Sequence, residues 1–315
     1  MTGTTSTRPR TVLQLPLDLV RGFLIGLAEL VPGVSGGTIA LVTGVYEQLI
    51  GSASHVLAAV RRLVTGPDRR AGVATELRRT DWRLVVPVLL GMATAVLTVA
   101  GTMEHLVTEN PEHARGLFLG LVAASLAVPI RLLPPIERPG AGVVRDVLIV
   151  LVAAAVAFWL VGLADGAAVA NPSMPVVFLA ACVAICALVL PGVSGSFFLL
   201  AVGLYAPTMQ AVDERDLGYV AVFGAGAVVG MASIVRVLRH LLTHRRRVTL
   251  LAMTGLMLGS LRALWPWQSG SGSEPGDLVA PYAPVGGPGL LVLVGAVVVI
   301  AMIVLEDAVA RRHAA

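Results

Sequence analysis

The sequence predicts an all-α integral membrane protein made of two inverted-topology repeats, each a re-entrant helical hairpin followed by three transmembrane helices. Three observations lead to this prediction: the apolar composition, a PGVSG motif that occurs twice, and the uneven placement of arginine. The chain has 315 residues, of which 56% are hydrophobic and 13% charged. Its mean hydropathy is +0.85. That leaves too little polar surface to cover a soluble globule.

Six apolar runs are long enough to cross a bilayer at ~1.5 Å rise per residue. They are residues 84–107, 115–133, 145–164, 217–238, 248–265 and 288–306. Residues 1–14 have a basic start without the apolar core and cleavage site of a signal peptide, so we expect a cytoplasmic tail. The Gly-, Ser- and Pro-rich segment 269–288 is expected to be a flexible outer loop.

Two further apolar regions, about 15–60 and 174–211, are each interrupted by PGVSG. Proline removes a helix hydrogen bond, and the following glycine permits backbone angles that other residues resist. We therefore expect each region to consist of two helical arms joined at a break. The break residues are Pro32 and Gly33 in the first region and Pro191 and Gly192 in the second.

The placement of arginine decides whether these broken regions cross the membrane. All 23 basic residues are arginine. If both regions return to the side they entered, with the N-terminus inside, 20 of the 23 fall on the cytoplasmic side. Only Arg115, Arg215 and Arg262 then lie outside. A full crossing by either region would put the basic loops beyond it on the wrong side, so both are predicted to be re-entrant hairpins.

Three spans after each hairpin turn the second repeat, residues 174–310, upside down relative to the first, residues 15–165. Both termini are then cytoplasmic. Ala28 to Tyr46 aligns with Ala187 to Tyr205, with nine of the 19 positions identical. One hairpin should enter from each side of the membrane, and their tips should meet near its midplane.

The residues that follow each break are suited to bind an anion. Irregular backbone at membrane depth must be buried in protein or line a polar cavity. Free N–H groups at the start of the second arm, together with the serine and threonine hydroxyls, would donate to phosphate oxygens. In the alternative interpretation, serine only caps the helix and glycine only allows close packing. The expected phosphate-binding residues of the tips are Ser35, Gly36, Gly37, Thr38, Ser194, Gly195 and Ser196.

Three charged residues are candidates for a role in transport. Glu29 lies one turn before the first break and Glu47 follows the second arm, and neither has a counterpart in the second copy. Such an asymmetry suits a proton-coupling carboxylate, although Glu47 could instead reach the cytoplasmic interface. Arg262 could clamp a phosphate group or extend towards water beside Trp265 and Trp267.

Other chemistries find little support. Cys182 and Cys186 stand four apart on one apolar helix face, where small-residue packing is the favoured interpretation over a metal or redox pair. His55, His105 and His240 lack metal-site spacing. We expect neither a metal nor a cofactor. The arginines flank apolar runs, which argues against nucleic acid as a partner, and the missing Walker loop argues against ATP-driven transport.

The segments AELVPGVSGGTIALVTGVYEQL, AICALVLPGVSGSFFLLAVGLY and GLMLGSLRALWPW resemble the bacterial and archaeal family of polyprenyl-phosphate translocases. This family was once known as a membrane domain of unknown function. The resemblance covers about residues 15–310, and the family usually has Asp where Glu29 stands. It implies a multi-pass protein of the bacterial cytoplasmic membrane that returns undecaprenyl phosphate to the inner leaflet. From the carboxylate of Glu29, we expect a proton or a sodium ion to accompany the lipid phosphate. The family expectation also extends to Ser260, Arg262, Trp265, Pro266 and Trp267.

Three other functions remain open. Undecaprenyl-diphosphate phosphatases have a similar layout with a PGxSR-type motif, but Gly36 and Gly195 stand here in place of the phosphate-gripping arginine. A small-anion transporter could use the same site geometry, and a membrane scaffold would need no site at all. The sequence leaves the oligomeric state open.

Overall fold

A computed structural model of the protein describes residues 14–30, 34–65, 69–135, 140–162, 169, 171–269, 276–283 and 285–314. These residues are helical and contain no strand, apart from one isolated bridge between Gln268 and Leu278. The all-α class agrees with the prediction. The helices are α1 (Gln14–Glu29), α2 (Gly36–Val42), α3 (Tyr46–Thr65), α4 (Arg69–Arg79), α5 (Trp82–Glu109), α6 (Pro111–Ser125), α7 (Ala127–Arg131), α8 (Ala141–Val161), α9 (Met174–Val189), α10 (Gly195–Ala201), α11 (Tyr205–Asp213), α12 (Leu217–His244), α13 (Arg246–Ser260), the 3₁₀-helix η1 (Leu261–Leu264) and α14 (Gly286–Ala314).

Six segments within the described residues are long and apolar enough to cross a membrane, and they overlap the six predicted spans. Large apolar side chains on their outer faces are exposed, among them Leu97 (84%), Trp159 (63%) and Val297 (63%). Contiguous exposure of this kind belongs in lipid rather than in water. The chain is therefore a multi-pass membrane protein. The segments are Trp82–Met103, Pro111–Arg131, Gly142–Val161, Leu217–His244, Arg246–Leu264 and Gly286–Val304.

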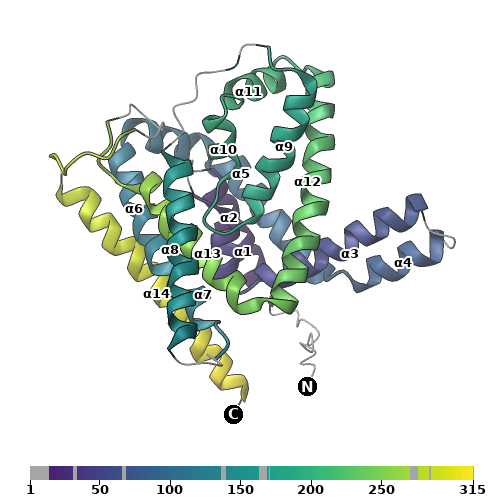
Figure 1. Cartoon of the computed structure of the whole chain (residues 1–315), viewed down its shortest axis with the longest axis horizontal. Helices are drawn as coiled ribbons and strands as arrows, with labels where there is room; N and C mark the ends of the chain where they lie inside the picture. Colours follow the sequence, from purple (N-terminus) through teal and green to yellow (C-terminus); the bar gives the residue numbers. More distant parts are fainter. Residues whose placement is uncertain are drawn as a thin grey trace.

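The long helices associate in four close pairs: α1 with α5, α9 with α12, α6 with α14, and α8 with α13 (Figure 1). Each pair has a glycine at a point where an added side chain would collide with the partner helix. Because lipid offers no hydrophobic force between helices, such close contact is a main source of their association. The glycines are Gly91 against α1, Gly230 against α9, Gly120 against α14 and Gly259 against α8.

Helices of matched length follow one another in the same order in the two halves of the chain. α1, α2, α5 and α6 have 16, 7, 28 and 15 residues. α9, α10, α12 and α13 have the same four lengths. The last long helix of each half, α8 or α14, packs against a helix of the other half. The halves are thus interlocked.

α3 and α4 form a pair that extends sideways from the body of the molecule (Figure 1). We call this pair, residues 46–65 and 69–79, the arm. Glu76 of α4 is buried between the two helices, where it accepts a hydrogen bond from His55 Nδ1 at 3.0 Å. Its other oxygen is 3.1 Å from Arg62 and 3.9 Å from Arg79. One carboxylate therefore joins the two helices of a strongly basic element.

We predict that Gly120→Leu separates α6 from α14, because the new side chain meets the backbone of Val292 and Ala296. Overpacking of this kind costs about 1–3 kcal/mol. Thermal unfolding of the purified protein in detergent measures the loss. Gly101→Leu is the control, since an added side chain there meets no described atom within 4 Å. Equal stability of the two variants would contradict the packing role of Gly120.

Glu76→Gln is predicted to speed amide hydrogen exchange in α4 at neutral pH, because it leaves His55, Arg62 and Arg79 without their shared carboxylate. The hydrogen bond from His55, and then the charges of Arg62 and Arg79, lower the pKa of Glu76 from its ordinary value of 4.5. The stabilising effect of ionised Glu76 is therefore fully present above pH 4.5. It is lost as the pH falls through the lowered pKa of this carboxylate. Glu109→Gln, which removes an exposed pair with His105, should leave α4 unchanged.

Candidate functional site

The described residues that follow the first break lie in the interior of the protein. α1 ends at Glu29 and α2 begins at Gly36. Between them Val34 is 2% exposed and Ser35 is 3% exposed, with Ser35 in an extended conformation as the residue before the helix. The predicted break residues Pro32 and Gly33 lie outside the described residues. The helix interruption itself is present where the motif predicts it.

At the second break, Pro191 and Gly192 form a turn between α9 and α10. Gly192 has φ +84°, and its backbone lies directly against Met257 of α13. An L side chain is strained at that angle and has no room beside α13. Ser194 caps α10, because its hydroxyl accepts the N–H of Phe197 at 3.4 Å. The helix is therefore interrupted at this point.

The two short helices after the breaks end in the same way. Gly44 and Gly203 both have φ +71°. Val45 N donates to Ala40 O at 3.0 Å, and Leu204 N donates to Leu199 O at 2.8 Å. With the accompanying glycine N–H bonds, each helix ends in a Schellman motif. α3 then starts at Tyr46 and α11 at Tyr205, and α10 and α11 meet at a bend of 109°.

The predicted first hairpin touches the predicted second one through three side-chain hydrogen bonds, which we call the tip-to-tip contact. Thr38 Oγ1 accepts the N–H of Gly192 at 3.0 Å, in a buried position. Ser35 Oγ donates to Leu190 O at 3.2 Å. Tyr46 OH donates to Val189 O at 3.0 Å. Backbone groups freed by the second break are thus satisfied by hydroxyls of the first half.

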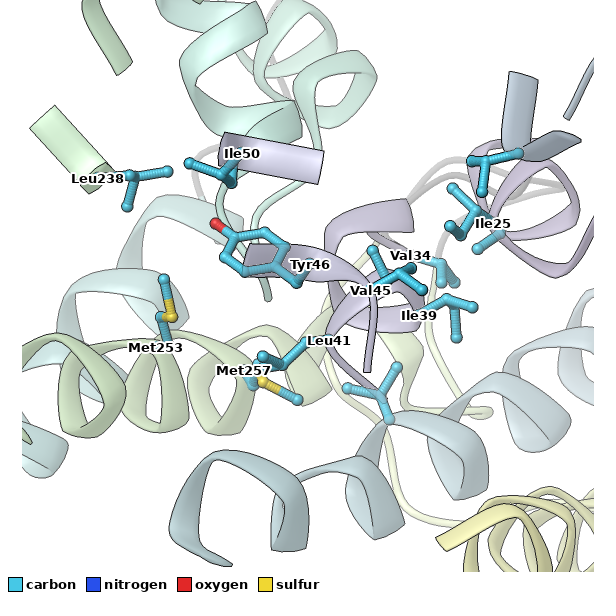
Figure 2. Packing of buried hydrophobic residues seen from close by; sticks show 14 of the residues in the cluster. Ile25, Val34, Ile39, Leu41, Val45, Tyr46, Ile50, Leu238, Met253 and Met257 are labelled. Atoms are coloured by element: carbon cyan, nitrogen blue, oxygen red, sulfur yellow. The ribbon is translucent and has the colours of Figure 1, made fainter. Parts of the chain in front are cut away.

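An apolar cluster surrounds the first hairpin and holds this contact in place. Figure 2 shows Tyr46 of α3 amid side chains from α1, α2, α12 and α13, including Ile25, Leu41, Leu238 and Met257. Tyr46 is 4% exposed. A buried tyrosine needs a partner for its hydroxyl, and Val189 O supplies one. Sequence reasoning did not assign Tyr46 to the site, although its identity with Tyr205 in the repeat alignment was a signal.

Glu29 already binds the backbone N–H of Gly36, a donor that the sequence predicted to be free for an anion. Its Oε1 accepts the N–H of Gly36 at 2.9 Å. A side chain at position 36 would collide with this carboxylate, so Gly36 allows the close approach. Gly37 packs against Val189 O of the second hairpin. The structure therefore brings Glu29, Ser35, Gly36, Gly37 and Thr38 into one group.

In the second tip, the hydroxyls of Ser194 and Ser196 lie 3.0 Å apart and share a hydrogen bond. Gly195 packs against Ala184 O of its own hairpin. Phe197 takes the place that Thr38 has in the first copy, and it packs against Ala263 of η1. The second tip thus has two hydroxyls of its own but lacks a carboxylate beside its short helix.

Arg262 and Glu47 lie apart from the tip-to-tip contact. Arg262, in η1, is partly exposed and stacks on the Phe158 ring of α8, 4.6 Å from its centroid. Through the neighbouring Ala263 it adjoins the second hairpin. Glu47, at the start of α3, is exposed and pairs with Arg246 at 2.7 Å. The structure groups neither residue with Glu29.

Cys182 and Cys186 contact the facing helix, since their Sγ atoms lie 3.0 Å from Gly226 O and 3.5 Å from Gly230 O of α12. Within the part of the chain that the structure describes, no cluster of three or more His, Cys, Asp or Glu residues could hold a metal ion. The groups that the structure brings together at the two breaks are hydroxyls, backbone groups and one carboxylate. Such groups bind and release an anion or a proton.

Comparison with known proteins gives consistent matches. A family model described as undecaprenyl phosphate translocase-like matches residues 25–274. A polyprenyl-phosphate transporter of Vibrio cholerae serotype O1 is 33% identical over 249 residues, which are 79% of this chain and 77% of that protein. A polyprenyl-phosphate transporter of Staphylococcus aureus is 26% identical over 263 residues, 79% of this chain and 86% of that protein. No solved structure matches this chain significantly.

Thr38→Val is predicted to destabilise the protein by about 1–3 kcal/mol, because the buried N–H of Gly192 loses its acceptor. Unfolding in a mixed detergent titration measures this change. Thr43→Val is the matched control, since that buried hydroxyl only donates within its own helix, to Ile39 O. A loss no larger than that of the control would show that the bond between the tips contributes nothing to stability.

Proposed function

This chain belongs to the undecaprenyl phosphate translocase-like family, and we propose that it moves polyprenyl phosphate across the cytoplasmic membrane of a bacterium. In this proposal it is a flippase that returns undecaprenyl phosphate to the inner leaflet. The observation that carries it is the tip-to-tip contact. Two interrupted hairpins, one from each half, meet in the interior of a multi-pass membrane protein beside a carboxylate.

The proposed topology has re-entrant hairpins at about 15–60 and 174–211, repeats at 15–165 and 174–310, and both termini in the cytoplasm. The matched helix lengths and the shared Schellman ends of α2 and α10 support the repeats. Ion pairs between Arg247 and Asp146 and between Arg246 and Glu47 gather the starts of α3, α8 and α13 at one end of the molecule. Each of these segments is predicted to lie at the cytoplasmic side.

For the substrate site, we propose that the phosphate group binds between the tips while its lipid chain stays in the bilayer. Ser35, Gly36, Gly37 and Thr38 would contact it from the first hairpin. Ser194, Gly195 and Ser196 would contact it from the second, and Arg262 would meet it on the outer side of that hairpin. Many of these groups bond to one another in the described conformation. The phosphate would replace those bonds as the two halves alternate between open sides.

Glu29 is the proposed coupling group. A phosphate that approaches Gly36 N–H meets the negative carboxylate that already accepts this bond. Protonation removes the repulsion and weakens the hold of Glu29 on the N–H, so a proton would travel with the anion. A sodium ion beside the carboxylate would have a similar effect. For Glu47 we propose a secondary part, in an ion pair with Arg246 that changes as the halves move.

Hydrolysis of a polyprenyl diphosphate is disfavoured by the space around the two motifs. The arginine of a phosphatase-type motif would stand at position 36 or 195. A side chain at position 36 would meet the Glu29 carboxylate, and one at position 195 would meet Ala184 O. An arginine at position 195 would require the backbone of α9 to move, whereas at position 36 the flexible Glu29 side chain would have to give way. We propose a transporter rather than an enzyme.

The test of function is the amount of undecaprenyl phosphate on the outer surface of cells that lack other translocases. Loss of this protein should raise that amount, and an unchanged amount would refute the proposal. Purified protein in liposomes separates the rivals. Release of inorganic phosphate from a polyprenyl diphosphate would indicate a phosphatase, whereas flux of a soluble anion without lipid movement would indicate a small-anion transporter.

Glu29→Gln is predicted to lower lipid-phosphate transport by roughly 10-fold or more, the usual size of a coupling effect, and to flatten its dependence on pH. The neutral amide resembles the protonated acid, but it cannot take up and release a proton during transport. Glu29→Asp keeps a carboxylate and should retain most of the activity. Glu214→Gln, which removes an exposed carboxylate beside Gln210, is the control. A Glu29→Gln protein that keeps a normal pH profile would exclude Glu29 as the coupling group.

A further inference from the structure

The arm is a separate feature that transport by the tips does not explain. Figure 1 shows α3 and α4 projecting sideways, transverse to long helices such as α12. The base of the arm is attached to the body by two side-chain hydrogen bonds. Arg239 of α12 donates to Ser54 at 3.0 Å, and the N–H of Asp81 donates to Ser52 at 3.3 Å. Ala53 and Leu57 of α3 also pack against the main apolar cluster, whereas the outer ends of α3 and α4 project away from the remaining helices.

Beyond the first turn of α3, the exposed charge of the arm is positive. Its exposed arginines come from both helices, whereas Glu76, the acidic residue described there, is buried between them. Arg62 and Arg79 share that one carboxylate. A surface with this excess of arginine attracts a surface that carries many negative charges. The exposed arginines are Arg61, Arg62, Arg69, Arg70, Arg78 and Arg79.

Exposed apolar side chains accompany these arginines. Val60 is 52% exposed and Leu63 is 58% exposed, and both adjoin the arginine pair of α3. A helix that presents arginine together with large apolar side chains is typical of an element that lies in the boundary between headgroups and acyl chains. A soluble acidic partner would explain the arginines but not these two residues.

The position of α4 relative to the first long span gives its depth. Trp82, the first residue of α5, is 44% exposed, and its Nε1 donates to Leu77 O of α4 at 2.7 Å. Further along α5, Leu89 and Leu90 are each 57% exposed on the apolar surface of the span. Tryptophan at the end of a span is typical of the membrane–water boundary. The end of α4 is bonded to a residue at that boundary.

From these observations we propose that the arm lies on the cytoplasmic surface of the membrane and binds the anionic headgroups of phospholipids. The inference rests on the topology proposed above and not on the transported substrate. Arginines of the arm contact the headgroups, while Val60 and Leu63 enter the boundary with the acyl chains. α3 runs without interruption from Tyr46, which contacts the second hairpin, into this surface. The arm therefore fixes the first hairpin relative to the cytoplasmic leaflet.

Depth measurement by electron paramagnetic resonance tests this proposal on the full-length protein in lipid nanodiscs. A spin label at Leu63→Cys is read in a Cys182→Ala/Cys186→Ala background, because these are the only two native cysteines. In nanodiscs that contain phosphatidylglycerol, we expect the label at the headgroup boundary, protected from a water-soluble relaxation agent. In phosphatidylcholine alone, or at about 1 M salt, where charges are screened beyond ~3 Å, it should become more accessible.

Charge variants supply the matched comparison. Arg69→Gln/Arg70→Gln/Arg78→Gln should weaken attachment of the arm to the anionic surface by about 100-fold and return the label to water. Arg69→Lys/Arg70→Lys/Arg78→Lys keeps the charge and should preserve the protected position. A spin label at Val228→Cys, on the exposed face of α12, should lie within the lipid in every variant and in both lipid compositions. This position shows that each variant is folded.

Two results would overturn the proposal. A Leu63 label that is in water in both lipid compositions would mean that the arm faces the cytosol, where a soluble partner could bind it. A label at equal depth in both compositions, and in the Gln variant, would mean that charge has no part in its position. The depth reading does not depend on transport, so failure of the flippase proposal would not change it.

Discussion

The need to satisfy backbone polar groups inside a membrane protein controls the arrangement of this molecule. Each interrupted helix exposes N–H and C=O groups that lipid cannot satisfy. At the second break, side chains of the first half bond to Gly192 N–H and to the carbonyls of Val189 and Leu190, and Leu190 O also accepts the N–H of Val193. The two hairpins therefore depend on each other. Neither tip could leave the interior without giving up buried hydrogen bonds, unless a polar ligand replaced them.

The side chains that make this contact all come from the first half, although the two motifs are nearly identical. Thr38 accepts a bond across the contact, whereas Phe197 at the matching position packs against Ala263. Glu29 has Leu188 as its counterpart, so only the first hairpin carries a carboxylate at this point. The two motifs thus share the same backbone sequence but carry different side chains beside it. Such an arrangement suits one shared site with a single titratable group better than two independent sites.

Close packing and charge at the helix ends hold the scaffold around the tips. Glycines let four pairs of long helices approach to backbone contact, and two of the pairs join the halves. At one end of the molecule, Asp146 is 6% exposed and pairs with Arg247, which also bonds to Pro134 O. At the other end, Trp267 donates to Tyr282 O and Tyr282 OH donates to Glu112. Segments far apart in sequence are thereby fixed at both ends of the spans.

The sequence by itself determined the features that follow from local chemistry. Apolar runs located the six spans, and PGVSG located both helix interruptions, because length, hydropathy and proline act within a few residues. Only the tertiary structure decided which groups meet. Thr38 and Gly192 are separated by 154 positions, and Glu47 and Arg246 by 199. No periodicity connects such residues, so the partner of Tyr46, the carboxylate on Gly36 N–H and the exposed ion pair of Glu47 follow from the packing of the two halves.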